Sequence, residues 1–333
     1  MGAEDVTEPG GVGIDWIRRE QRARARLGAD APGLALDERR RLARAVSDLL
    51  AEEAAAPVDE RARIHEIALP GVAGESFARV YEPPGTPSSP PTQLFLHGGG
   101  FLFGGARERV NDALLSARSV ATGLRIVSYE YALAPEHPYP AARDEVVRVF
   151  RLLHDRAEEL RIDAERIGIG GMSAGGSVAA SAALVLVREG GPVPFHASLE
   201  APALSLRGIG ERSADDAPHP AMAAQIAEYP ALSAAYAPGA PDLAFVADAD
   251  TVEGFPPTLL VLAEFDVLTD GALGFAQRLR AQGGHVRVHV RAGHVHGSPA
   301  ATAISPEARS WQDLVARELR EAYGTEGAGA DAG

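Results

Sequence analysis

The sequence predicts an α/β fold in which a mainly parallel, eight-stranded sheet carries helices on both faces and a helical cap. From about residue 92 onward, short apolar segments alternate with segments of helical periodicity. Strands that are apolar throughout and alternate with helices indicate a parallel sheet that is covered on both sides. Two amphipathic helices come before these units, and a segment rich in Ala, Asp and Pro interrupts them; together they predict the cap.

The first two strands differ from the others, because they alternate apolar and polar residues around a Gly-rich turn. This pattern is typical of an antiparallel pair. The expected strands are 62–69, 76–81, 93–96, 124–131, 166–170, 196–199, 258–263 and 285–291. The expected helices are 15–27, 36–53, 107–122, 141–160, 174–188, 222–236, 270–282 and 306–323, with Asp37 as the N-cap of the second.

These elements divide the chain into a core and a cap. Residues 1–55 are expected to form N-terminal cap helices, with the first dozen residues disordered, and residues 207–255 a second cap insertion. The core then comprises residues 56–206 and 256–323. The final segment, 324–333, is rich in Gly and Ala and is expected to be a flexible tail.

Composition excludes several classes of protein. The 333 residues can bury one large core plus a small cap, and the net charge of −14 argues against a nucleic-acid partner. The chain has no cysteine, which excludes disulfides and fits a reducing cytoplasm. Its acidic N-terminus does not resemble a secretory signal, and the apolar run at 178–187 is too short to span a membrane. We therefore expect a cytoplasmic protein without a membrane span.

A possible nucleophile lies where the apolar strand at 166–170 meets the small-residue helix at 174–188. The junction, residues 171–175, has the pattern Gly-x-Ser-x-Gly with Ser173 at its centre. A strand, a tight turn and a helix in this order can hold a serine hydroxyl exposed at the edge of a sheet. By composition alone the pattern arises in roughly one such chain in five, so it needs further support.

A second segment supplies that support. The strand at 93–96 ends in His97-Gly98-Gly99-Gly100, and glycines let the backbone turn several N–H groups into one concavity. The developing oxyanion of an acyl transfer needs such fixed donors. The alternative is a flexible loop at the end of a strand. His97 is expected to brace this loop, and His137, in a proline-rich turn, is also assigned a structural role.

The strand at 258–263 is followed by candidate acids. A carboxylate at the end of a strand can reach across the sheet edge, and Asp266 is preferred there, with Glu264 as the alternative. Asp270 or Thr269 is expected to cap the next helix.

After the last strand, His294 and His296 compete for the role of base. The pair could also ligate a metal, because residues i and i+2 of a strand share a face, but no Cys or carboxylate cluster accompanies it. With His296 as base, the order Ser…Asp…His is that of α/β-hydrolases.

Taken together, these motifs resemble the bacterial hormone-sensitive lipase-like family of α/β-hydrolase esterases. The resemblance covers residues 60 to 320, with the N-terminal helices similar to the family's cap. It implies the α/β-hydrolase fold, with Ser173 as nucleophile, Asp266 as acid and His296 as base. His296 is selected because it precedes Gly297, as in the family's His-Gly-Phe pattern. The oxyanion donors implied are the backbone N–H groups of Gly98, Gly99 and Ala174.

The chain departs from the family beside these residues. Met172 stands where the family usually has Asp or Glu, and Ser298 replaces an aromatic residue. We expect the first change to alter pH dependence and substrate preference without abolishing the chemistry. Phe101, Phe103 and Met172 are candidates for contacting substrate, although both phenylalanines could equally pack under the cap.

The expected reaction is hydrolysis of a small-molecule carboxylic ester, with a short to medium acyl chain, through an acyl-enzyme and without a metal or organic cofactor. One alternative is transfer of the acyl group to an acceptor other than water, in an enzyme that tailors a larger metabolite. Another is a non-catalytic ligand-binding relative, although such proteins lose a triad residue. Homodimerisation is left open by the sequence.

Overall fold

A computed structural model describes residues 11–72, 74–206, 209, 217, 220–239 and 244–325. Its strands are β1 (Arg63–Gly71), β2 (Gly74–Glu82), β3 (Thr92–Leu96), β4 (Arg125–Tyr129), β5 (Ile167–Met172), β6 (Ala197–Glu200), β7 (Thr258–Phe265) and β8 (Val286–Val295). They form one sheet in the order β1-β2-β4-β3-β5-β6-β7-β8. The pairs β1·β2 and β2·β4 are antiparallel and the remaining neighbours are parallel. The predicted mainly parallel sheet and its antiparallel first pair are therefore confirmed.

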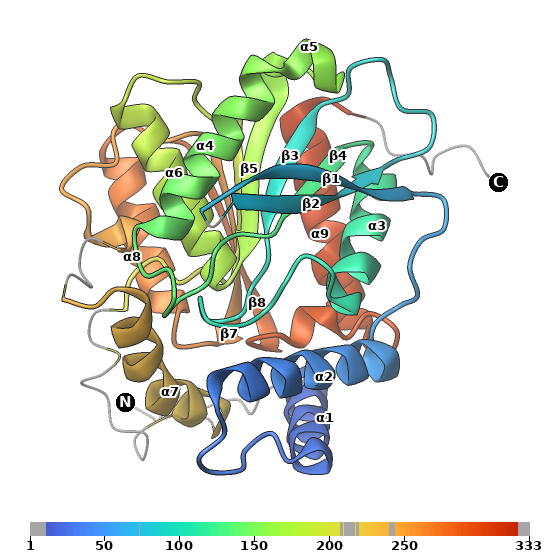
Figure 1. The fold of residues 1–333 in the computed structure, drawn as a ribbon, viewed down its shortest axis with the longest axis vertical. Helices are drawn as coiled ribbons and strands as arrows, with labels where there is room; N and C mark the ends of the chain where they lie inside the picture. Colours follow the sequence, from blue (N-terminus) through green and yellow to red (C-terminus); the bar gives the residue numbers. More distant parts are fainter. Residues whose placement is uncertain are drawn as a thin grey trace, which may run out of the picture.

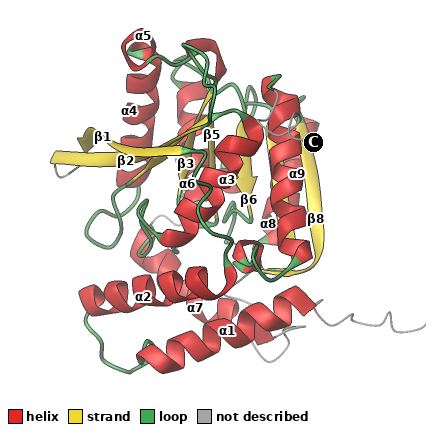
Figure 2. Cartoon of the chain, turned by 90° about the vertical axis from the view of Figure 1, so that its right-hand side faces the viewer, coloured by secondary structure: helices red, strands yellow, loops and turns green. Residues whose placement is uncertain are grey.

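The helices cover both faces of this sheet and one of its ends (Figure 1). They are α1 (Gly11–Leu27), α2 (Leu36–Ala54), α3 (Arg109–Thr122), α4 (Ala141–Asp155), α5 (Ala157–Leu160), α6 (Ala174–Arg188), α7 (Pro220–Tyr236), α8 (Thr269–Ala281) and α9 (Pro306–Tyr323). Short 3-10 turns η1 (Ala164–Arg166), η4 (Val246–Asp248) and η5 (Ser298–Ala300) connect some of them. The side view shows α1, α2 and α7 together across one end of the sheet (Figure 2).

Several predicted boundaries need correction. The helix expected at 141–160 is divided, because Arg156, with φ −106° and ψ 22°, leaves the helical region between α4 and α5. The last strand, β8, is longer than predicted and ends at Val295. Its pairing with β7 continues past a register shift, so that Phe265 pairs with Val295. Asp37 is not an N-cap, since Ala35 holds that position without a side-chain bond. Leu268, and neither Asp270 nor Thr269, is the N-cap of α8.

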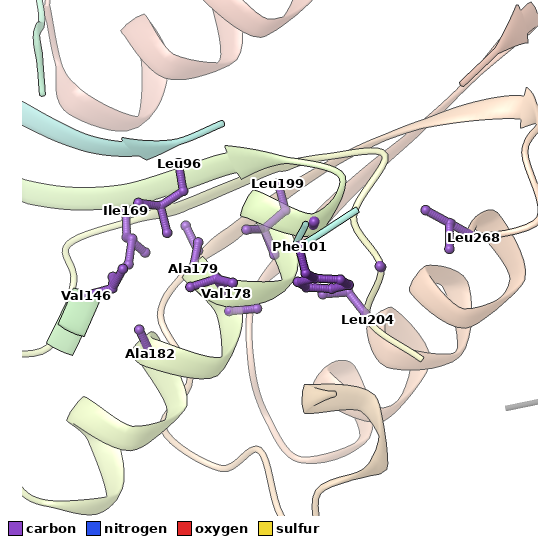
Figure 3. Packing of buried hydrophobic residues seen from close by; sticks show 14 of the residues in the cluster. Leu96, Phe101, Val146, Ile169, Val178, Ala179, Ala182, Leu199, Leu204 and Leu268 are labelled. Atoms are coloured by element: carbon purple, nitrogen blue, oxygen red, sulfur yellow. The ribbon is translucent and has the colours of Figure 1, made fainter. Parts of the chain in front are cut away.

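The core follows the alternation of side chains along the strands. In β3, Leu94 and Leu96 join the large cluster that includes α4, α6 and α8, whereas Phe95 points to the other face, against Leu115 of α3. Ala179 and Val178 of α6 lie beside strand residues such as Leu199 (Figure 3). A separate cluster buries Trp311 and its neighbours on α9 against β7. The small residues of α6 therefore let this helix pack closely on the central strands.

The helices α1, α2 and α7 lie where the cap is expected (Figure 2), and the division of the chain into core and cap stays a prediction. The indole of Trp16, on α1, packs against Gly297, because a Cβ added to this glycine would lie 3.0 Å from the indole Nε1. Residues 1–10 and most of the expected tail and of the segment 207–219 lie outside the described residues. None of the helices in the described ranges has the length and apolar character needed to cross a membrane.

A buried ion pair fixes β6 beside the nucleophile turn. Arg118 donates to Glu200 Oε1 at 2.6 Å, and Trp311 Nε1 donates to Glu200 Oε2 at 2.8 Å. Arg118 is 4% exposed and Glu200 is 0% exposed. The backbone carbonyl of Glu200 also accepts from the N–H of Ser173 at 2.9 Å. This network therefore connects α3, α9 and β6 to the position of the serine.

Replacing Glu200 by Leu should lower the free energy of unfolding by about 3–5 kcal/mol, because Arg118 would remain as a buried charge without its carboxylate. Urea denaturation monitored by circular dichroism measures this loss. The double variant Arg118→Met/Glu200→Leu should recover much of the lost stability, since it removes both charges. A double variant that is as unstable as the single one would contradict this explanation.

Candidate active site

Ser173 lies in the sharp turn between β5 and α6. Its φ of 54° and ψ of −122° are strained for a residue with a Cβ. Space for the turn comes from flanking glycines: a Cβ on Gly171 would lie 2.6 Å from the carbonyl carbon of Gly175. Ser173 is 8% exposed, so its hydroxyl is held at the edge of the core. The residues of the Gly-x-Ser-x-Gly pattern thus form the predicted strand–turn–helix.

The structure brings together the three residues selected from the sequence. His296 Nε2 lies 2.9 Å from Ser173 Oγ, and His296 Nδ1 lies 2.6 Å from Asp266 Oδ2. With Nδ1–H donating to the carboxylate, Nε2 is free to accept the hydrogen of the Ser173 hydroxyl. Each residue follows the carboxyl end of a strand, namely β5, β7 or β8, and so all three meet at one edge of the sheet.

Asp266 has donors on both oxygens. In addition to His296 on Oδ2, its Oδ1 accepts from the backbone N–H of Leu268 at 3.1 Å and from Gln225 Nε2 at 2.9 Å. Asp266 is 3% exposed, so these bonds replace water around the charge. The alternative acid, Glu264, is exposed and accepts from the N–H of Gly293 at 2.8 Å. Its contact with the histidine strand is therefore structural.

The environment of His296 favours its protonated form. Burial alone lowers the pKa of the imidazole, but the Asp266 carboxylate raises it by charge and by hydrogen bonding, and Glu20 on α1 adds to this effect. The net result is a pKa above the ordinary value of 6.5. Burial in turn raises the pKa of Glu20. The Glu20 carboxylate, on a helix of the cap, thus raises the pKa of His296 although it is not one of the residues Ser173, His296 and Asp266.

The competing histidine, His294, has a different environment. Its Nδ1 lies 2.8 Å from Ser298 Oγ, and its ring lies 5.1 Å from that of Trp311. Burial lowers the pKa of His294 to about 4. The Ser298 hydroxyl donates to the carbonyl of Val295 at 2.9 Å and accepts from the N–H of Val295 at 3.2 Å. Ser298 therefore fixes the turn that contains His296.

The Gly-rich loop after β3 lies against the serine. A Cβ on Gly98 would lie 3.5 Å from the Cβ of Ser173. Gly99 has a φ of 132°, and a side chain there would collide with the carbonyl of Phe103. A side chain at Gly175 would collide with the carbonyl of His97, so the start of α6 and this loop pack backbone to backbone. The backbone therefore needs glycine at positions 99 and 175, whereas a Cβ at position 98 would make only ordinary contacts.

His97 braces the loop, as expected. Its ring stacks on Tyr131 with centroids 4.3 Å apart, and its Nδ1 lies 2.8 Å from the carbonyl of Gly98. The Tyr131 hydroxyl donates to the carbonyl of His97 at 2.8 Å. Burial lowers the pKa of His97. In the other turn with a structural histidine, the N–H of His137 donates to the carbonyl of Leu133 at 3.0 Å.

The residues expected to contact substrate differ in exposure. Phe101 is buried and stacks on Tyr236 of α7, with ring centroids 3.8 Å apart. Phe103 is half-buried, and the guanidinium of Arg39 lies 5.4 Å from its ring centroid. Met172 is also half-buried and packs against the core. Phe101 thus lies under the cap, whereas Phe103 and Met172 keep part of their surface open.

Sequence reasoning missed two residues of the cap. Gln225 reaches Asp266, as described above, and Tyr229, one turn later on α7, is buried beside it. Burial raises the pKa of Tyr229 well above its ordinary range. The available signal was a single polar residue within the apolar stripe of the helix at 222–236.

The structure also bears on the metal hypothesis. His294 contacts Ser298, whereas His296 contacts Asp266 and Ser173, so the two imidazoles serve different partners. Within the described ranges, no group of three His, Cys, Asp or Glu side chains is arranged to hold a metal ion.

Comparisons with known proteins agree with this geometry. A family profile described as the alpha/beta hydrolase fold matches residues 93–300. Esterase LipI of Mycobacterium tuberculosis is 32% identical over 252 residues, which cover 73% of this chain and 77% of the relative. Carboxylesterase NlhH of the same species is 34% identical over 248 residues, covering 69% and 73%.

Solved structures are similar as well. A thermostable carboxylesterase cloned from a metagenomic library has a TM-score of 0.76 and 28% identity, covering 87% of this chain and 98% of that one. A hyperthermophilic esterase from the archaeon Pyrobaculum calidifontis has a TM-score of 0.80 and 25% identity, covering 95% and 99%. By the extent of the profile match and the identity to its relatives, the chain belongs to the α/β-hydrolase-fold family.

Proposed function

We propose that this protein hydrolyses carboxylic esters of short to medium acyl chain through Ser173, His296 and Asp266. The broader statement, an ester-hydrolysing enzyme of the α/β-hydrolase fold, rests on the family and on relatives named esterases and carboxylesterases. The observation that supports the specific assignment is the continuous pair of hydrogen bonds, 2.9 Å and 2.6 Å long, from Ser173 through His296 to Asp266.

In the first step, Ser173 Oγ attacks the ester carbonyl carbon while its proton passes to His296 Nε2. Asp266 keeps the imidazole in the tautomer that can accept this proton and stabilises the cation that forms. The bond between the acyl carbon and the alcohol oxygen then breaks, and the imidazolium gives its proton to the departing alcohol. The acyl group remains on Ser173.

In the second step, water gives a proton to His296 as its oxygen attacks the acyl-enzyme. The carboxylic acid leaves, and Ser173 regains its proton from the imidazolium.

The backbone N–H groups of Gly98, Gly99 and Ala174 are proposed to bind the oxyanion of both steps. Support comes from the packing of Gly98 against Ser173 and from the position of Ala174 at the first turn of α6, where the helix dipole favours negative charge. These donors are part of the backbone, so they are fixed before the reaction and need no reorganisation.

The proposed acyl length rests on how closely the cap approaches the loop. A Cβ on Gly100 would lie 3.1 Å from Leu232 on α7, and Tyr236 covers Phe101. This packing limits the room for a long chain beside the donor loop. Phe103 and Met172 are both half-buried, and we propose that they contact the substrate.

Changing Ser173 to Ala should reduce hydrolysis of p-nitrophenyl acetate and butyrate on the order of 10⁴-fold or more, because the nucleophile is lost. Release of p-nitrophenolate, followed at 405 nm on purified protein, gives the rates. Ser177→Ala is the matched control, since it removes a buried hydroxyl from the same helix one turn later and should leave the rate near wild type. If both variants keep wild-type rates, Ser173 is not the nucleophile.

The pH dependence follows from the raised pKa of His296. The imidazole must be neutral to take the proton, so kcat/KM should rise with pH through a midpoint above 6.5.

Asp266→Asn should lower the midpoint, because burial then dominates the pKa of His296, and should reduce kcat by about 10⁴-fold. Glu20→Gln should lower the midpoint by a smaller amount, with little loss of rate. Stopped-flow or plate-reader rates from pH 5 to 9 provide the test; a wild-type midpoint below 6.5 would oppose it.

A further inference from the structure

One face of α7 contacts the candidate catalytic groups at several points. Gln225 bonds Asp266, Tyr229 is buried beside it, Leu232 lies against Gly100, and Tyr236 stacks on Phe101. The positions 225, 229, 232 and 236 are separated by four, three and four residues, so they share one face of the helix. The cap helix therefore meets both the triad acid and the donor loop.

Gln225 is the polar member of this face, and its amide is fixed at both ends. Its Nε2 donates to Asp266 Oδ1 at 2.9 Å, while its Oε1 accepts from the backbone N–H of Val267 at 3.3 Å. The oxygen must face the N–H of Val267, which leaves only the NH₂ group to face the carboxylate. The orientation of this side chain is thus determined by the backbone next to Asp266.

These contacts assign the two oxygens of Asp266 to different partners. The donors Leu268 N–H and Gln225 Nε2 converge on Oδ1, and Oδ2 is left for His296. Without Gln225, the Oδ1 of a carboxylate with a fully buried side chain would depend on one long backbone bond. The carboxylate could then rotate away from the imidazole, and its charge would be less dispersed.

We propose that Gln225 is a positioning residue that makes the catalytic acid depend on docking of α7. The inference rests on the proposed function and goes beyond it, because the residue belongs to the cap and does not touch the reacting atoms. Lifting α7 would remove the second donor from Asp266 together with the contacts at Gly100 and Phe101. The triad is therefore fully ordered only when the cap covers the site.

The test is Gln225→Met, which keeps the length of the side chain but cannot donate. We expect kcat to fall about 10- to 100-fold, as for loss of a hydrogen bond to a buried charge, with KM within about twofold. The midpoint of the acid limb should move to lower pH, because a carboxylate that can turn away from the imidazole stabilises the imidazolium less. Gln225→Glu should move the midpoint in the opposite direction, to higher pH, by adding a second negative charge.

Gln282→Met is the matched control. This glutamine also accepts from a backbone N–H, that of Val252 at 2.8 Å, but it lies at the end of α8. It should change neither kcat nor the pH profile. A readout independent of turnover is the downfield proton resonance of the bond between His296 and Asp266, which should weaken or shift in Gln225→Met and persist in Gln282→Met.

The outcomes separate this inference from the proposed function. A wild-type protein with Ser173-dependent activity, and a folded Gln225→Met variant with the same kcat, pH midpoint and downfield proton, would overturn the inference alone. A change in KM without change in kcat or pH midpoint would also overturn it, since α7 would then act only on substrate binding. A wild-type protein whose ester hydrolysis does not depend on Ser173 would overturn both. Thermal unfolding of each variant confirms that folded protein is compared.

Discussion

The close approach of backbone to backbone at the start of α6 is the constraint on which the rest of the site depends. Gly175 packs against the carbonyl of His97, and Gly171 against Gly175, with no room for a Cβ at either glycine. This contact brings the end of β3, the end of β5 and the first turn of α6 together. Ser173 and the loop at 97–100 are therefore positioned by the same packing, before any substrate binds.

Around the start of α6, buried polar groups hold the ends of the strands in place. Glu200, buried with Arg118 and Trp311, fixes β6 beside the serine. Ser298 closes the turn that carries His296 through the two bonds of its hydroxyl to the backbone of Val295. A buried polar group that is fully bonded specifies one geometry, which is what a reacting triad needs.

Much of this could be predicted from sequence, for identifiable physical reasons. The apolar strands and the glycine patterns reflect local requirements, so the sheet, the turn at Ser173 and the choice of Asp266 over Glu264 could be inferred. The division between α4 and α5 at Arg156 could not, because neither Gly nor Pro marks it. The extra length of β8 depends on pairing with β7, which no local pattern reveals. The polar Gln225 in an apolar stripe marks an unusual position, but its partner Asp266 lies 41 residues away and cannot be identified from the helix alone.

The proposed function depends on an acyl group that Ser173 holds between two half-reactions. Rapid acid quench of the protein during turnover of a slowly hydrolysed p-nitrophenyl ester, followed by mass spectrometry of its peptides, tests this directly. We expect an added acyl mass on the peptide that contains Ser173 and the loss of this mass when turnover is complete. An acyl adduct on another residue, or turnover with no adduct at any time resolved by the quench, would contradict it.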